Sequence, residues 1–218
     1  MKMLDVPQSG SLAGETSSRN RFGQYKRTRA IPVNPNSAQQ GVVRARMAAN
    51  SQGWKLISAG QRAGWLDLAT SMVRYDKLGQ SYTMQPNQCY ASINNTRAAC
   101  GLAATADAPA VTAPAGLATV TVTLTAASFS IAYTATPLAA ANYMFIFVSP
   151  QRSAGRNFEA DYRLLAVTAA AAASPHNALA AYTAKFGVPI VGNKIFVSLV
   201  TSTLGFLGGP WRMSQVVA

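Results

Sequence analysis

The hydrophobic pattern of the sequence changes abruptly after residues 102–118, a linker of alanine, proline, threonine and glycine. Beyond this linker apolar and polar residues alternate, with Val120, Val122 and Leu124 separated by threonines. This period of two is that of a strand with one buried face, because successive side chains of a strand point to opposite sides. We therefore predict that residues 119–218 form β-sheets, whereas the part of the chain before the linker carries helical signals.

Several segments of residues 119–218 have the composition of strands and are bounded by turn residues. The segment 143–148 is apolar on both faces, as expected of a central strand. The predicted strands are 119–125, 129–133, 143–148, 162–168, 178–185, 194–201 and 211–217. This spacing predicts an immunoglobulin- or fibronectin-like antiparallel β-sandwich, although the Cys…Trp…Cys framework of antibody domains is absent.

Residues 34–101 are predicted to form a small helical domain. A serine followed three residues later by a glutamine forms a capping box, in which the two side chains bond free N–H groups at the helix start. Two such pairs occur, Ser37 with Gln40 and Ser58 with Gln61, and a third helix is predicted between Pro86 and Gly101. Trp54 and Trp65 fall on the apolar stripes of the first two helices. We predict that they form a shared core or docking element, with a nucleobase platform as the alternative.

Positive charge is concentrated before the linker. Residues 1–100 contain 13 Lys and Arg against 4 Asp and Glu, whereas residues 101–218 contain 6 against 3. The densest basic stretch, with its interleaved aromatic residues, comprises Arg19, Arg21, Phe22, Tyr25, Lys26, Arg27 and Arg29. Such a segment can neutralise phosphates or an acidic protein surface, and its aromatic side chains can stack on bases.

Residues 1–33 show neither helical nor strand periodicity and are rich in glycine, proline and serine. They are predicted to be an extended basic arm. A free arm of this composition should fray, so an ordered one requires a partner surface. We interpret it as an anchor on an assembly; a mobile, solvated arm is the alternative.

The residues that build common catalytic and metal sites are scarce. His176 is the single histidine, it lies in a predicted loop, and no nucleophile motif, phosphate-binding loop or metal-ligand spacing occurs. Glu159 and Asp161 are the only close pair of acidic residues. We predict a solvated hairpin edge beside Arg156 and Arg163 there, with a weak cation site as the alternative. No catalytic residue, metal or cofactor is predicted, and the expected protein is not an enzyme.

The motifs of the helical region resemble those of a group of tailed-bacteriophage and prophage proteins. The matching residues are Asn34-Pro-Asn-Ser-Ala-Gln-Gln, Val43-Arg44, Trp54 and Gln61-Arg62-Ala-Gly-Trp65. The pattern is approximately NP-x-[ST]-x-x-Q, then V-R, then W, then QR-x-x-W, followed by a linker and a β-domain. Members of this group are mostly structural, so the resemblance implies a component of the virion. It carries over no active-site residues.

The leading expectation is a capsid decoration or minor capsid protein, present in many copies or as a homo-oligomer and bound to the major capsid protein or other virion proteins. The alternatives are a nucleic-acid-binding protein that uses the basic arm, and a tail- or fibre-associated module that binds a host surface or glycan. Tyr143, Tyr162, Tyr182 and Trp211 are compatible with a glycan site but more typical of a core. The chain lacks an apolar run of 18–20 residues and a secretory signal peptide. The expected location is therefore the virion, after synthesis in the bacterial cytoplasm and without a membrane partner.

Overall fold

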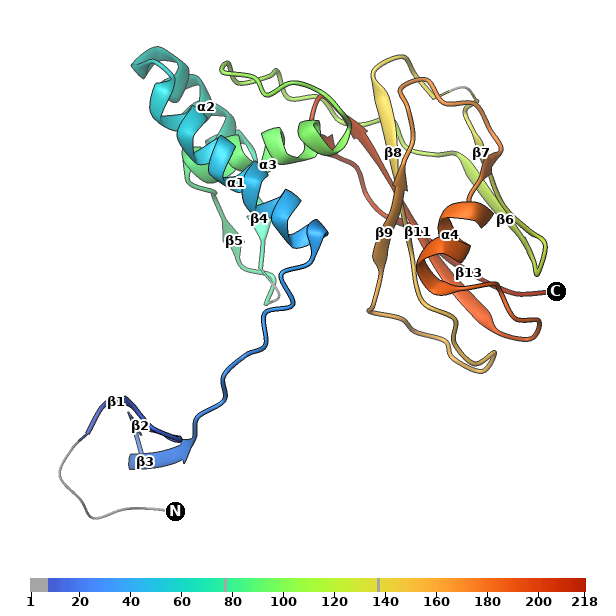
Figure 1. Ribbon diagram of the computed structural model, residues 1–218. Coiled ribbons are helices and arrows are strands. Elements are labelled where there is room, and N and C mark those ends of the chain that lie inside the picture. The colour runs from blue at the N-terminus through green and yellow to red at the C-terminus, as the bar shows by residue number, and fades with distance from the viewer. Residues whose placement is uncertain (1–7, 77, 137) are drawn as a thin grey trace. The chain divides into compact units, whose positions relative to one another are not determined.

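The computed structural model describes residues 8–76, 78–136 and 138–218 (Figure 1). Residues 1–7 of the predicted arm lie outside the described residues. The chain divides into two compact units, Met1–Val42 and Val43–Ala218, which are treated separately below. It contains four helices and several antiparallel sheets in its described part, which confirms the predicted α+β class.

The N-terminal unit contains a small sheet where an extended arm was predicted. Its three antiparallel strands are β1 (Gly10–Leu12), β2 (Glu15–Asn20) and β3 (Gly23–Thr28). Two-residue turns connect them, and residues 29–37 have no regular structure. The prediction of a segment without strands was therefore wrong. Its strands are almost entirely polar, so they lack the apolar alternation by which a strand with one buried face is detected.

Three helices follow, with a two-stranded hairpin inserted before the last. They are α1 (Ala38–Leu56), α2 (Ala59–Ser71), β4 (Arg74–Tyr75), β5 (Ser81–Tyr82) and α3 (Pro86–Ala99). Both predicted capping boxes are formed. The Ser37 hydroxyl accepts the Gln40 N–H at 3.3 Å, and the Ser58 hydroxyl accepts the Gln61 N–H at 3.2 Å. Gly101 has a φ of 76°, as is usual for the residue that ends a helix.

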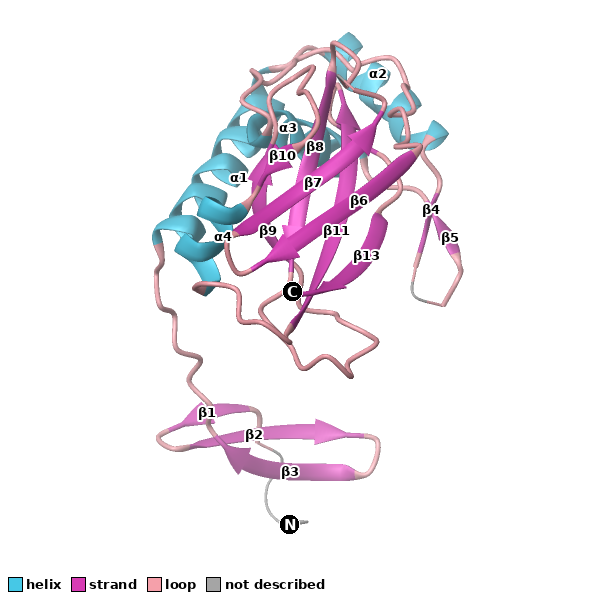
Figure 2. Cartoon of the chain, turned by 90° about the vertical axis from the view of Figure 1, so that its right-hand side faces the viewer, coloured by secondary structure: helices cyan, strands magenta, loops and turns pink. Residues whose placement is uncertain are grey.

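Residues 119–218 form two antiparallel sheets that face each other across one core (Figure 2). The first sheet comprises β6 (Thr119–Thr125), β7 (Ser128–Thr134) and β10 (His176–Asn177). The second comprises β8 (Asn142–Val148), β9 (Arg163–Val167), β11 (Lys194–Thr203), β12 (Phe206–Leu207) and β13 (Trp211–Val216). The valines and leucine of β6 are buried, and the threonines at 119, 121 and 123 are exposed, so the alternation that predicted this strand describes its burial.

The predicted strand 178–185 is instead a helix, α4 (Leu179–Phe186). Alanine-rich segments favour helix, and Leu179, Tyr182 and Phe186 are spaced so that they lie on one helical face. Tyr182 is fully buried, and its ring lies 5.5 Å from that of Phe129 in an edge-to-face contact. The segment was predicted to be a strand because its apolar residues were assigned to a period of two. In the structure they form one helical face that packs against β7.

One turn of the second sheet packs into the helical part of the same unit. Gly205 lies between β11 and β12 with a φ of 100°. A Cβ atom at this position would lie 2.7 Å from the Cγ2 atom and 2.8 Å from the carbonyl oxygen of Ile93 in α3. The next residue, Phe206, is buried in the core formed by the three helices. The close backbone approach at Gly205 therefore allows a β-hairpin to complete the helical core.

Candidate functional site

The seven residues predicted to form the basic arm are distributed over the sheet β1–β3. Arg19 lies on β2, whereas Tyr25, Lys26 and Arg27 lie on β3. Arg21 and Phe22 form the turn between these strands, and Arg29 follows β3. Pairing in this register places Arg19 and Lys26 on one face and Tyr25 and Arg27 on the other. Both faces of the sheet therefore carry positive charge.

This sheet has no core of its own. Every described residue of the N-terminal unit, from 8 to 42, is exposed or only half-buried. Its large apolar side chains point into solvent: Leu12 is 85% and Phe22 is 67% exposed. The guanidinium carbon of Arg21 lies 4.8 Å from the centre of the Phe22 ring, which is a cation–π contact at the surface. Small sheets need an apolar face or a packed helix to be stable, and the described residues of this unit provide no buried apolar face.

The first half of α1 is also incompletely covered. Val43 and Met47, predicted to lie on the apolar stripe of this helix, are 50% and 48% exposed. Asn50 is the single fully buried residue of α1, and its side-chain amide donates to the Asn95 side-chain oxygen at 3.0 Å. The Met47 sulfur accepts a hydrogen bond from the Asn95 amide at 3.0 Å, so the stripe contacts the rest of its unit from Met47 onward while about half of the Val43 and Met47 side chains remains exposed.

Trp54 and Trp65 both contact the same ring, that of Tyr90 in α3. The ring centres lie 5.5 Å and 5.2 Å from it, respectively. Trp65 is fully buried, and its indole N–H donates to the Ala106 carbonyl at 2.8 Å. Trp54 is half-buried, with the guanidinium of Arg62 5.8 Å from its ring centre. Trp65 therefore has no exposed surface that a ligand could contact, whereas the half-buried Trp54 side chain has some.

The acidic pair of residues 159 and 161 lies in an ion-pair cluster and not on a solvated hairpin edge. The side chain of Glu159 is 1% exposed and accepts from Arg152 Nε at 2.5 Å. Its other oxygen accepts the backbone N–H groups of residues 160 and 161 at 2.9 Å each. Asp161 pairs with Arg163 at 3.1 Å. The hydrogen bond from Arg152 and those from the backbone lower the pKa of Glu159 from 4.5 to about 2.

Replacing Glu159 by glutamine should change how stability depends on pH. As pH falls from 5 toward 2, the unfolded chain binds a proton at Glu159 before the folded chain does, so the wild-type protein loses stability. The E159Q variant should be less stable than wild type at pH 7, and it should lose less stability than wild type as the pH falls from 5 toward 2. Urea unfolding at a series of pH values measures both effects. The R152Q/E159Q double variant should recover part of the loss at pH 7, because it also removes the cation that donates the shortest of the bonds to Glu159; equal pH slopes for wild type and E159Q would contradict the assignment.

The prediction that His176 lies in a loop is wrong: this residue is in strand β10, opposite Ile131. Burial lowers the pKa of its imidazole. Across the described ranges, no group of three or more His, Cys, Asp or Glu side chains is placed to hold a metal ion. Cys89 is buried and Cys100 half-buried, and both are free thiols. No helix in the described part of the chain is long and apolar enough to cross a membrane.

A cavity of about 650 Å³ opens beside the β4–β5 hairpin, between α3 and β12. Its lining combines hydroxyl groups and apolar side chains with one charged residue, Arg74. No carboxylate, imidazole or thiol is among the described residues of this lining. The cavity therefore offers an anionic or apolar group a binding place without an acid–base pair.

Comparisons of the chain with protein-family models, with curated proteins and with solved structures found no match.

Proposed function

We propose that this protein is a structural component of a bacteriophage virion, a capsid decoration or minor capsid protein. In this proposal the sheet β1–β3 and the exposed face of α1 bind an acidic protein lattice. The observation that carries the docking role is the sheet itself, which is regular and yet has no buried residue among its described members. Residues 10–29 contain five arginine and lysine residues against one glutamate, which favours an acidic partner. The choice of a virion is supported by the sequence motifs of residues 34–65.

The two-sheet domain is, in this proposal, an immunoglobulin-like display module. Support comes from its antiparallel sheets with a shared core and from the chain crossing between the sheets after β7 and again after β9. A rigid two-layer scaffold with loops at its edges suits display, since loops can vary without loss of the core. Many copies on one particle would also make individually weak contacts effective.

Deletion of residues 1–30 should leave a folded protein that is not incorporated into particles. The helical core and the β-domain core both lie after residue 43, so circular dichroism and tryptophan fluorescence should report retained structure. Incorporation is measured by comparing purified particles made with the full-length and the truncated chain. Normal incorporation of a folded truncation would refute the docking role.

A finer test removes charge from one face of the sheet. The R19Q/K26Q variant loses both cations of one face of β2 and β3, and incorporation should fall at least several-fold. The matched control K55Q/R74Q removes one lysine and one arginine outside the N-terminal unit and should be incorporated normally. An equal loss of incorporation in both variants would contradict a role for this face of the sheet, because incorporation would then depend only on the net charge of the chain.

Salt separates the acidic-protein partner from nucleic acid, the second candidate. Binding to phosphates weakens steeply with added salt, because counterions are released for each neutralised phosphate. A protein interface that includes the apolar Val43–Met47 face should persist. We expect particle association to survive 0.5 M NaCl, whereas binding to a duplex DNA probe should not; the reverse order would favour nucleic acid.

A further inference from the structure

A second cavity, of about 260 Å³, lies on the outer face of the larger β-sheet. Its floor follows from strand register: Phe196 of β11 is paired with Ser214 of β13, and Arg212 lies two residues from Ser214 on the same face. The loop before β9 forms the wall with Asn157, Phe158, Glu159 and Tyr162. The volume is below the range of cavities that hold drug-sized ligands, about 300–1,000 Å³, and suits a single small ring.

The wall loop is fixed in place by its own ion pairs and backbone contacts. Arg152 exchanges two backbone hydrogen bonds with Lys194 of β11, at 2.9 and 2.7 Å. The Lys194 ammonium donates to the Arg156 carbonyl at 2.9 Å, and Arg156 Nε donates to the Phe158 carbonyl at 2.7 Å. Together with the buried Glu159 carboxylate, these bonds hold the loop rigid, so a ligand would meet a preformed wall.

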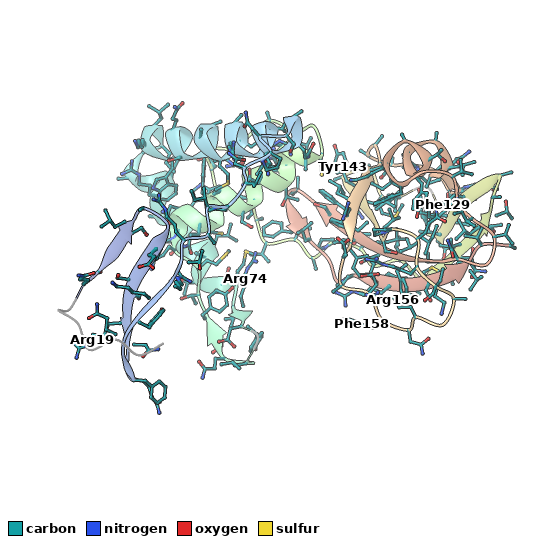
Figure 3. The ribbon with its side chains drawn as sticks, turned by 60° about the horizontal axis from the view of Figure 1, so that its bottom comes forward. Arg19, Arg74, Phe129, Tyr143, Arg156 and Phe158 are labelled. Atoms are coloured by element: carbon teal, nitrogen blue, oxygen red, sulfur yellow. The ribbon has the colours of Figure 1, made fainter. Side chains whose placement is uncertain are left out.

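This rigid loop exposes an aromatic residue. Phe158 is 71% exposed although its own carbonyl accepts a hydrogen bond from Arg156 and the next residue, Glu159, is buried (Figure 3). Tyr162, half-buried at the same cavity, is covered by the Arg212 guanidinium, whose central carbon lies 5.8 Å from the ring centre. Two aromatic groups beside one cavity provide apolar faces that a pyranose ring can contact with its C–H groups.

Four polar side chains that line the cavity form no hydrogen bond with the described residues. Within the described ranges, no hydrogen bond involves the side chain of Asn157 or Ser214, the Tyr162 hydroxyl or the Arg212 guanidinium. The cavity thus presents an amide, two hydroxyls and a guanidinium fork beside aromatic rings. Such groups bind the hydroxyls of a sugar, and the planar guanidinium binds a carboxylate through two parallel hydrogen bonds.

The charges around the cavity favour an anionic sugar over a neutral one. The carboxylates of Glu159 and Asp161 are already paired with Arg152, Arg156 and Arg163. Arg212 is the fourth arginine of the region and forms no ion pair with the described residues. The cavity therefore keeps a free cation, and a carboxylate is its natural partner.

We infer that the cavity formed by Asn157, Phe158, Tyr162, Arg212 and Ser214 binds the carboxylate-bearing sugar residue of an acidic glycan. Arg212 binds the sugar carboxylate, Asn157 and Ser214 bind ring hydroxyls, and Phe158 and Tyr162 contact the apolar face of the ring. This site goes beyond the proposed docking function, because it lies on the β-domain and uses none of the residues of the N-terminal unit.

Titration calorimetry and ligand-detected NMR on the full-length chain test this inference. The probes are trigalacturonate, neutral galactotriose of the same length, and acetate as a carboxylate without a sugar. Trigalacturonate should bind at least tenfold more tightly than either control. The R212Q variant should lose at least tenfold in affinity for trigalacturonate, and F158A a smaller factor. R46Q, which removes an arginine of α1 outside the cavity, should bind as wild type.

Three outcomes would overturn the inference: equal affinity for trigalacturonate and acetate, equal affinity for the acidic and neutral trisaccharides, or full affinity in the R212Q variant. Circular dichroism of R212Q guards against misfolding, and the Y162F variant gives a second test because it keeps the ring and removes only the hydroxyl. Y162F should weaken binding less than R212Q does. Because the binding assay contains no particle, its result is independent of the incorporation experiments.

Discussion

The Gly205→Ala protein should be less stable than wild type by about 2–5 kcal/mol. A positive φ near 100° costs a residue with a side chain about 1–2 kcal/mol, and overpacking a filled site adds roughly 1–3 kcal/mol. The added Cβ would meet the backbone oxygen of Ile93 at 2.8 Å, and backbone in the middle of α3 cannot move aside easily. Urea unfolding followed by tryptophan fluorescence and circular dichroism measures the loss.

Two other glycines separate the causes of this effect. Gly192 also has a positive φ, 86°, but nothing lies within 4 Å of its Cβ position, so G192A should lose only the conformational part, about 1–2 kcal/mol. Gly209 has neither constraint, and G209A should stay within about 0.5 kcal/mol of wild type. If G205A and G192A were equally destabilised, the close approach to α3 would contribute nothing.

Replacement of Trp65 by alanine should cost about 3–5 kcal/mol, the range for removing a large aromatic side chain from a core. Trp65 has no exposed surface, contacts Tyr90 edge to face, and donates a hydrogen bond from its indole to Ala106. The loss should be measured by chemical unfolding, with the far-ultraviolet circular dichroism of the helices as the readout.

Conservative and peripheral replacements provide the controls for Trp65. W65F keeps an aromatic ring but leaves the Ala106 carbonyl without its donor, so a loss of about 1–3 kcal/mol is expected. Trp211 is 39% exposed on β13, and W211A should lose well under half of what W65A loses. A W211A protein as unstable as W65A would contradict the ranking of the two sites by burial.

Local signals in the sequence are sufficient for the first three helices and for most strands of the β-domain. Ser58 and Gln61 determine where α2 begins. Each side chain accepts a hydrogen bond from the backbone N–H of the other residue, and the two residues are only three positions apart in the chain. The alternation around Val122 identifies β6 because it is also a local signal. Apolar residues occupy every second position of a segment of seven residues, and these are the residues that the folded strand buries. α4 was predicted incorrectly because an apolar, alanine-rich segment of eight residues fits either period.

The N-terminal sheet shows the limit of this approach. Its basic and aromatic residues predict a docking segment, but polar strands without an apolar face carry no periodic signal, so the sequence does not predict β2 and β3. The division of its cations between two faces depends on which residue opposes which, for example Ser17 opposite Lys26. Pairing between strands is a property of the folded sheet.

The placement of the helical region before the β-domain, the starts of the first three helices and the location of the basic segment can be read from the sequence, because they depend on residues close together in the chain. Only the tertiary structure decided that Phe206 completes the helical core, that Glu159 is buried between arginines, and that Arg212 and Tyr162 meet at one cavity. Arg212 and Tyr162 are fifty positions apart in the sequence. They become neighbours through the packing of a loop on a sheet, and no local pattern records that packing.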